Sequence, residues 1–108
     1  METVGGEIQV EELKRRLDAG EDIYVLDVRE PHEYQIANIG GHLIPLGDLP
    51  NRVHELDTSR EIVAHCKSGG RSAKAVTFLR QAGFKRVDNL AGGITAWADR
   101  VDPKMPKY

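Results

Sequence analysis

The chain has 108 residues, 40% of them hydrophobic and 30% charged, which is typical of one globular domain with a core of its own. Its formal net charge of -2 at pH 7 argues against nucleic acid or an anionic membrane as a partner, and no stretch approaches the roughly 20 apolar residues of a membrane span. One cysteine cannot form an internal disulfide and the first residues lack the features of a signal peptide, so we expect a cytoplasmic location.

The pattern of apolar residues predicts short strands that alternate with helices. In chain order we expect a flexible arm over 1–7, a brief strand at Ile8 and Val10, a helix over 10–17, a strand over 23–28, a helix over 31–36, a strand at 43–44, a helix over 48–55 capped by Asp48, a strand over 62–65, a helix over 72–82, a strand over 85–90, a short helix carrying Ile94 and Trp97, and a tail over 102–108. Such alternation indicates an α/β domain over 8–101, with a mostly parallel central sheet of about five strands and helices on both faces.

The strand over 62–65 leads into the most informative segment of the chain, His-Cys-Lys-Ser-Gly-Gly-Arg-Ser at 65–72. A strand, a glycine-containing loop and a helix, in that order, aim backbone N–H groups at an anion. In open parallel sheets, ligands bind beyond the carboxyl ends of the strands, which is where Cys66 lies. The segment therefore predicts an anion-binding loop that begins with the single thiol of the chain.

Several features of this loop are expected to lower the pKa of Cys66 from the value of about 8.5 that is usual for a free thiol. The following helix carries partial positive charge at its N-terminus, and the paired glycines can adopt the positive φ that lets amides converge. The segment 65–74 contains no acid but three bases, Lys67, Arg71 and Lys74. We predict Cys66 as a nucleophile, with the binding residues Lys67, Ser68, Gly69, Gly70, Arg71 and Ser72. The alternative is a small buried cysteine beside a solvated loop.

Four segments in this order resemble the signatures of the rhodanese-type sulfurtransferase domain: Leu26 to Tyr34, Ile39 to Leu46, His65 to Ser72, and Gly92-Gly93-Ile94 with Trp97. The resemblance implies that Cys66 accepts a sulfane sulfur from thiosulfate or a protein persulfide and passes it to a thiophilic acceptor. It implies that the loop amides hold the terminal sulfur, that Lys67 and Arg71 attract an anionic donor or acceptor, and that no cofactor takes part. The sequence departs from the family at Gly40 and His42, and the bulk of His42 leaves the local packing open.

Spacing separates this reading from a related one. In phosphatases of the cell-cycle type the cysteine and arginine enclose five residues, whereas Cys66 and Arg71 enclose four. The shorter loop disfavours a phosphatase or a small arsenate reductase. A non-catalytic binding or regulatory module with the same fold stays open, although the presence of the nucleophile argues against it.

Within the family, the sequence looks most similar to the C-terminal domain of adenylyltransferase–sulfurtransferases that serve molybdopterin, thiamine or tRNA-thiolation pathways. The segments that carry this likeness are 44–49, 65–69, 89–94 and 102–108. The resemblance implies a ubiquitin-like sulfur-carrier protein as acceptor, converted to a thiocarboxylate at its C-terminal Gly-Gly. The chain lacks an adenylation domain, so it is either an excised piece or a stand-alone relative.

The other polar residues receive structural interpretations. Asp27 and Arg29 follow a strand, and we expect a supporting ion pair or loop-holding role rather than catalysis. Strand alternation points His65 away from Cys66, so a satisfied or exposed histidine is expected there. The remaining histidines show no metal-ligand spacing, so no metal site is predicted.

Overall fold

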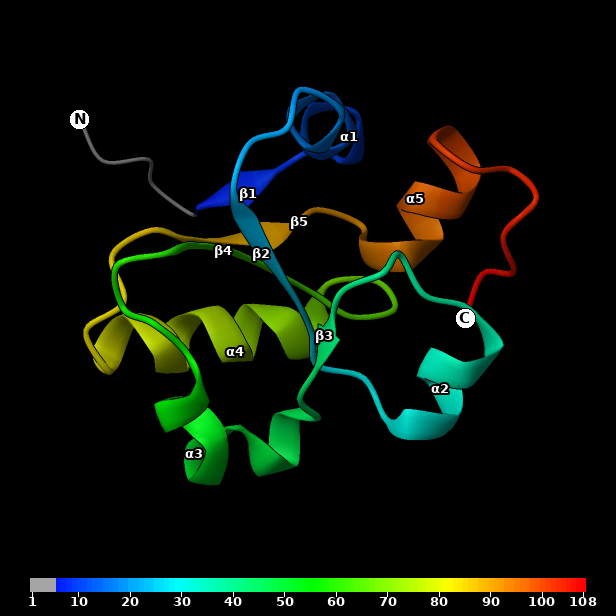
Figure 1. The fold of residues 1–108 in the computed structure, drawn as a ribbon. Coiled ribbons are helices and arrows are strands. Elements are labelled where there is room, and N and C mark those ends of the chain that lie inside the picture. The colour runs from blue at the N-terminus through cyan, green and yellow to red at the C-terminus, as the bar shows by residue number, and fades with distance from the viewer. Residues whose placement is uncertain (1–5) are drawn as a thin grey trace.

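The computed structural model describes residues 6–108, so the expected arm lies outside the described residues as far as residue 5. Five strands form one sheet in the order β1-β5-β4-β2-β3, and every neighbouring pair is parallel (Figure 1). The strands are β1 (Glu7–Ile8), β2 (Ile23–Asp27), β3 (His42–Leu43), β4 (Glu61–His65) and β5 (Val87–Leu90). The predicted parallel α/β domain is confirmed, and Glu7, assigned to the arm, already belongs to the sheet.

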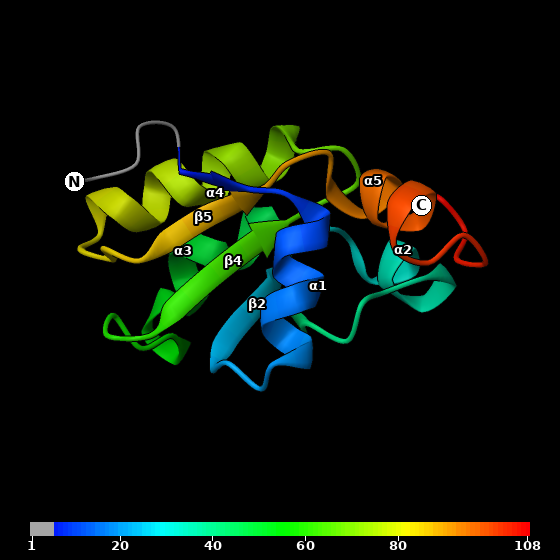
Figure 2. The ribbon, with the colours of Figure 1, turned by 90° about the horizontal axis from the view of Figure 1, so that it is seen from above.

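Helices cover both faces of the sheet (Figures 1 and 2). Helices α1 (Val10–Asp18) and α5 (Gly93–Arg100) lie on one face, and α3 (Leu49–Arg52) and α4 (Gly70–Gln81) lie on the other. The short helix α2 (Pro31–Ile36) lies beyond the carboxyl end of β2. Because side chains alternate along a strand, Val63 of β4 packs in the core beneath α1 and α5, whereas Ile62 and Ala64 pack in the core beneath α3 and α4. No helix among residues 6–108 has the length and apolar character needed to cross a bilayer.

The helix expected over 48–55 is wrong in its continuity. A 3₁₀ turn, Leu46–Asp48, precedes α3, and a second one, Val53–Glu55, follows it. Asp48 makes no side-chain capping bond, because its backbone is already turned to φ -93° and ψ -13° as the last residue of the first 3₁₀ turn. An N-cap residue instead takes an extended conformation.

Several boundaries differ from expectation by one or two residues, and Val10, expected in the first strand, begins α1. Helix α4 begins at Gly70, two residues before the expected start, so Gly70 and Arg71 lie in its first turn rather than in the loop. Strand β5 is shorter than expected and begins at Val87. Because α4 starts earlier, its N-terminus lies within four residues of Cys66 in the sequence.

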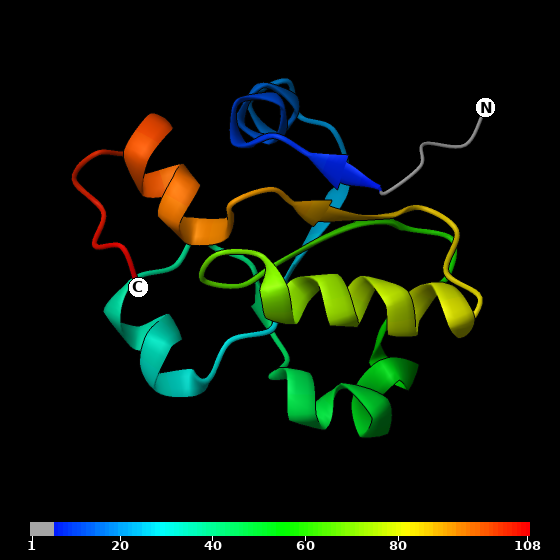
Figure 3. The ribbon, with the colours of Figure 1, turned by 180° about the vertical axis from the view of Figure 1, so that it is seen from behind.

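The C-terminal segment returns to the domain and ends near α2 (Figure 3). Met105 packs against the core beneath α1 and α5, and Lys107 pairs with Asp99. Arg29 Nη1 donates a hydrogen bond of 2.8 Å to the carbonyl oxygen of Tyr108. The residues expected as a tail therefore contact both α5 and the segment after β2.

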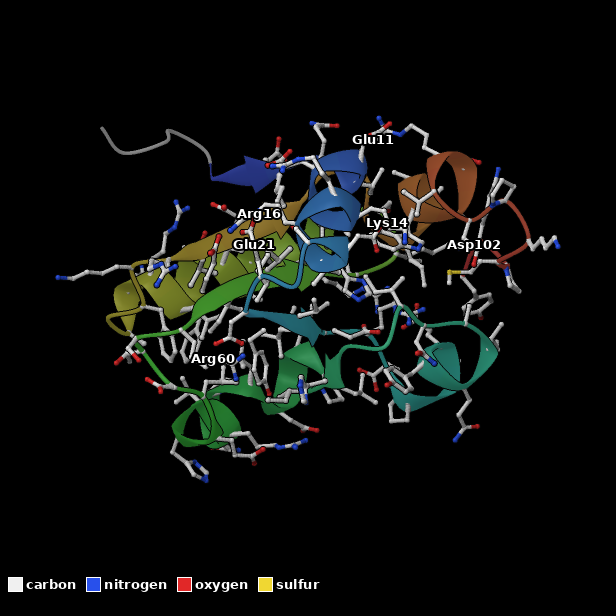
Figure 4. All side chains as sticks on the ribbon, turned by 45° about the horizontal axis from the view of Figure 1, so that its top comes forward. Glu11, Lys14, Arg16, Glu21, Arg60 and Asp102 are labelled. Carbon is white, nitrogen blue, oxygen red and sulfur yellow. The ribbon has the colours of Figure 1, made fainter. Side chains whose placement is uncertain are left out.

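The opposite edge of the sheet, at the amino ends of β2 and β4, carries a network of paired charges. Arg16 lies beside Glu21 (Figure 4), and its guanidinium bonds Glu21 and Glu61 at 2.7 Å each. Arg60 bonds Asp22 at 2.5 Å in the same region. These pairs connect the α1–β2 turn to the start of β4, far from Cys66 along the strands.

Candidate active site

Cys66 directly follows the last residue of β4, and its side chain is only 2% exposed. It belongs to the core beneath α3 and α4, on the same face as Ala64. Three donors surround its sulfur: the Gly69 amide at 3.1 Å, the Ser72 amide at 3.4 Å and the Ser72 hydroxyl at 3.4 Å. The structure thus places the sulfur inside the loop, where donors converge on it.

The convergence depends on the backbone of Gly69 and on the start of α4. Gly69 is the N-cap residue and has φ +118°, a conformation that residues with a Cβ rarely adopt. It turns the chain so that the N-terminus of a twelve-residue helix points at Sγ. The first-turn amides of a helix lack intrahelical partners and carry partial positive charge, so they favour a thiolate there.

These contacts lower the pKa of Cys66 below its ordinary value. Burial of the thiol acts in the opposite direction and raises the pKa, because it disfavours the charged form. Hydrogen bonds from the Ser72 hydroxyl and from the amides of Ser72 and Gly69 together outweigh the effect of burial on the pKa. The site is therefore built to hold a sulfur anion out of water.

The N-terminus of α5 holds the same loop from the outside (Figure 3). The amides of Ile94 and Thr95 donate hydrogen bonds of 3.0 Å to the carbonyl oxygens of Cys66 and Lys67. Gly93 makes this approach possible, because a Cβ on Gly93, which has φ +57°, would lie 2.5 Å from the Cys66 carbonyl oxygen. With the loop carbonyls engaged by α5, the loop amides remain available to the sulfur.

Arg71 does not present a free charge to the loop, in contrast to the expectation from the basic segment 65–74. Its guanidinium makes two bonds to the Glu33 carboxylate, of 2.7 and 2.9 Å. The bond from Arg71 lowers the pKa of Glu33 to about 2, with a smaller contribution from the Glu30 amide against the effect of burial. Sequence reasoning missed Glu33, whose only signal was its place in the segment from Leu26 to Tyr34.

Comparison with known proteins agrees with this geometry. Residues 9–100 match the Rhodanese-like domain family. The chain belongs to this family. It is 42% identical over 93 residues to a protein of Allochromatium vinosum named "Sulfurtransferase", covering 85% of this chain and 87% of that protein. It is 39% identical over 107 residues to the Mycobacterium tuberculosis "Probable adenylyltransferase/sulfurtransferase MoeZ", covering 96% of this chain and 27% of that protein.

A solved structure gives the same result at the level of the fold. The Rhodanese-like Domain Protein of Staphylococcus aureus superposes with a TM-score of 0.82 at 29% sequence identity, over 89% of this chain and 94% of that one. Some relatives are longer than this chain, which spans 52% of the Bacillus subtilis protein YrkF at 39% identity. The rhodanese-like domain is therefore the shared unit.

The rim of the loop in this rhodanese-like domain is exposed. Lys67, Ser68 and Gly70 face solvent, and Lys74 is exposed on the outer side of α4. The Lys67 ammonium lies 5.2 Å from the centre of the Tyr108 ring, in a cation–π contact. The C-terminal segment thus forms part of the rim beside the loop.

Asp27 and Arg29 of the rhodanese-like domain form a fully buried ion pair with a bond of 2.7 Å. Arg29 also donates to the carbonyl oxygens of Glu33, Ala37 and Tyr108, so it joins α2 to the C-terminal segment. Within residues 6–108, neither side chain makes a hydrogen bond to Cys66 Sγ. This placement supports the structural role expected from the sequence.

The two histidines considered from the sequence occupy different environments. His65 is fully buried, and its Nε2 lies 3.6 Å from Asp27 Oδ2, so the expectation of an exposed alternative is wrong. It points away from Cys66, because it packs on the opposite face of β4. His42 is exposed and stacks on the Tyr24 ring at a centroid distance of 4.3 Å, which accommodates its bulk. Within residues 6–108 no group of three His, Cys, Asp or Glu side chains is placed to hold a metal ion.

Proposed function

We propose that this rhodanese-like domain is a sulfurtransferase that carries a sulfane sulfur as a persulfide on Cys66. The observation that carries the proposal is the set of amide and hydroxyl donors within 3.4 Å of Cys66 Sγ. A buried sulfur anion needs such donors, and a buried structural cysteine does not. The sulfurtransferase name of the relative from Allochromatium vinosum, which matches along nearly its whole length, gives independent support.

Two displacements at sulfur account for the reaction. In the first, the Cys66 thiolate attacks the outer sulfur of thiosulfate, the S–S bond of the donor breaks, and sulfite leaves with the electron pair. In the second, a nucleophilic acceptor attacks the outer sulfur of the Cys66 persulfide, and Sγ leaves as a thiolate. Charge is conserved in each displacement, and dividing one transfer into two is the usual benefit of covalent catalysis.

The alternatives predict different chemistry. A phosphatase or arsenate reductase would need a loop that surrounds a tetrahedral oxyanion, whereas Cys66 and Arg71 enclose four residues and Arg71 is bonded to Glu33. A non-catalytic module would need no donors around Sγ. Both are weaker candidates than sulfur transfer for these reasons.

We also propose a place for the sulfur to go. The 39% identity with MoeZ, together with the resemblance that residues 102–108 contribute to, favours a ubiquitin-like sulfur-carrier protein as acceptor, as in molybdopterin, thiamine or tRNA-thiolation pathways. A protein persulfide or thiosulfate would be the donor. A reducing, cytoplasmic compartment would keep the thiol available. Incubation of the loaded domain with activated carrier proteins, followed by mass analysis of the carrier, tests for thiocarboxylate formation.

The decisive experiment is intact mass measurement after incubation with thiosulfate. We expect the protein to gain one sulfur atom, and the Cys66→Ser variant to gain none. A Lys67→Ala variant is expected to load more slowly and with weaker salt dependence, because it loses one exposed positive charge at the rim. Absence of loading with thiosulfate and with persulfide donors, or hydrolysis of a phosphate ester that depends on Cys66, would overturn the proposal.

A further inference from the structure

Asn89 is a buried amide directly beside the loop, and nothing in the sulfur-transfer scheme above uses it. It lies on β5, is 6% exposed, and stands opposite Ala64 of β4 in the sheet register. Its Nδ2 donates a hydrogen bond of 3.2 Å to the Gly69 carbonyl oxygen. Because a carbonyl oxygen can only accept, this contact fixes the amide orientation and turns Oδ1 toward Ser72.

The Ser72 hydroxyl has one hydrogen and three acceptors within reach. Its Oγ lies 2.5 Å from Asn89 Oδ1, 3.3 Å from the Gly69 carbonyl oxygen and 3.4 Å from Cys66 Sγ. With a neutral thiol, the much shorter contact takes the hydrogen, and Asn89 Oδ1 receives it. A thiolate is a stronger acceptor than an amide oxygen, since hydrogen bonds to ionised groups are about twice as strong as neutral ones. The charge of Sγ therefore decides whether the hydroxyl donates to Asn89 Oδ1 or to Cys66 Sγ.

We propose that Asn89 is a positioning residue for sulfur transfer: it holds the Ser72 hydroxyl hydrogen while Cys66 Sγ is uncharged and releases it to Sγ when that sulfur carries negative charge. The proposal rests on the proposed function only for the steps at which Sγ gains and loses its charge. The contacts that carry it are those of the Asn89 amide with Ser72 and Gly69.

The negative charge leaves Sγ in the first displacement and returns to it in the second, so the acceptor of the Ser72 hydroxyl changes twice. When the thiolate attacks the donor, the charge passes from Sγ to the outer sulfur of the persulfide, and the hydroxyl returns to Asn89. When the acceptor attacks the outer sulfur, the S–S bond breaks and Sγ leaves as an anion. The hydroxyl then turns to Sγ and stabilises the leaving group. Asn89 thus keeps the donor ordered for the second displacement.

A double-mutant cycle on the thiolate separates this role from simple support of the loop. The pH dependence of Cys66 alkylation is measured in the wild type, Ser72→Ala, Asn89→Ala and the double variant. Ser72→Ala raises the midpoint by about one pKa unit, because a hydrogen bond to the anion is lost. Thr77→Ala removes another hydroxyl of α4, which bonds Ala73 instead, and leaves the midpoint unchanged.

The sign of the coupling decides the test. The effect of Asn89→Ala on the alkylation midpoint is compared in two backgrounds, with Ser72 present and with Ser72→Ala. If Asn89 competes with the thiolate for the hydroxyl, the shift measured with Ser72 present is lower by about half a pKa unit than the shift measured in the Ser72→Ala background. Loss of the Asn89 bond to Gly69 changes the alkylation midpoint equally in both backgrounds, so this effect cancels. Equal shifts in the two backgrounds, or a coupling of opposite sign, overturn the proposal.

Asn89→Asp covers the case in which Asn89→Ala does not fold, because aspartate has nearly the same shape. Its carboxylate holds the Ser72 hydrogen more strongly. The shift that Asn89→Asp causes in the alkylation midpoint is therefore larger and upward with Ser72 present, compared with the shift in the Ser72→Ala background. Equal shifts here are again contrary to the proposal.

Separate measurement of the two half-reactions distinguishes this proposal from the function itself. At a pH above all midpoints, Ser72→Ala slows discharge of the loaded persulfide to cyanide by about tenfold and leaves loading by thiosulfate nearly unchanged. Equal slowing of both steps contradicts the assigned role. If the wild type never loads, the proposed function fails, whereas the alkylation cycle still gives its own answer for Asn89.

Discussion

Glu33 occupies the position that most changes the interpretation of the loop at the scale of single residues. Its carboxylate accepts two hydrogen bonds from Arg71 and one from the Glu30 amide, and its side chain is 8% exposed. It therefore joins the first turn of α2 to the first turn of α4. Arg71 is therefore a structural anchor of the loop, and its charge reaches Cys66 only together with that of Glu33.

Replacement of Glu33 by Gln tests this anchor through its pH dependence. The pKa of Glu33 falls from 4.5 to about 2, so the unfolded state takes up the proton first as the pH falls. The stability that Glu33 contributes is complete above pH 4.5 and disappears as the pH falls through about 2. We expect the difference in free energy of unfolding between the wild type and Glu33→Gln to be constant near neutral pH and to narrow over that acid range.

The exposed pair of Arg15 and Glu12 provides a matched control. Its side chains are 65% and 46% exposed, so solvent screens the pair and Glu12→Gln should leave the free energy of unfolding nearly unchanged. A difference for Glu33→Gln that is as small as this, or that does not vary with pH, would show that Arg71 is not anchored as described. Chemical denaturation at several pH values measures both variants.

At the scale of elements, the loop after β4 is held by two helix N-termini at once. The N-cap amide and one first-turn amide of α4 point at the sulfur, while the first-turn amides of α5 point at the loop carbonyls. The two helices meet the loop from opposite faces of the sheet (Figure 1). Orientation of the loop peptides therefore depends on the packing of α5 as well as on the loop sequence.

Gly93→Ala is predicted to disturb this arrangement and to raise the midpoint of Cys66 alkylation. The added Cβ would lie 2.5 Å from the Cys66 carbonyl oxygen and 2.6 Å from that of Lys67, so α5 must move away from the loop. Gly20→Ala is the control, because Gly20 also has a positive φ, of +80°, but has no atoms within 4 Å of the added Cβ.

The control should cost about 1 kcal/mol of stability through backbone strain alone and leave the thiol unaffected. If Gly93→Ala destabilises no more than Gly20→Ala and alkylates with the wild-type pH profile, α5 does not orient the loop. Thermal unfolding and alkylation rates, measured on the same preparations, give both values.

At the scale of the whole molecule, a cluster of buried polar side chains at the carboxyl ends of β2 and β4 connects the sheet to α2 and the C-terminal segment. Asp27 and His65 are partners in the register of β2 and β4, and Arg29 extends the cluster to α2 and the C-terminal segment. Burial lowers the pKa of His65, with attraction by Asp27 acting against it and repulsion by Arg29 acting with it. The folded protein therefore holds His65 neutral.

This cluster predicts a loss of stability in mild acid. Because the pKa of His65 is lower in the folded state than its ordinary value of 6.5, the unfolded state binds more protons once the pH falls below about 6.5. The free energy of unfolding should decline below that pH, and His65→Gln should flatten the decline. His54→Gln replaces an exposed histidine and should leave it unchanged. An identical decline in wild type and His65→Gln would contradict the prediction.

The sequence by itself determined the class of fold and singled out Cys66 and the loop that follows it. Apolar periodicity is local, so the strands and most helices could be predicted, and the loop from Cys66 to Ser72 is contiguous. The break around α3 was missed because a 3₁₀ turn and an α-helical turn have similar apolar spacing. The earlier start of α4 was missed because Gly70 has no helical preference of its own.

Only the tertiary structure decided which distant residues hold the loop around the sulfur. Glu33 and Asn89 lie 33 and 23 residues from Cys66 in sequence. Glu33 reaches Arg71 because α2 follows the carboxyl end of β2, and Asn89 reaches Ser72 because β5 ends on the same side of the sheet as β4. Hydrogen bonds of this kind depend on strand order and register, which no local pattern encodes. The same is true of Gly93, whose missing side chain matters only because the Cys66 carbonyl lies against it. The thiol and its nearest donors, Gly69 and Ser72, lie in one contiguous segment and were predictable from the sequence, whereas the residues that hold this segment come from distant parts of the chain brought together by the parallel sheet.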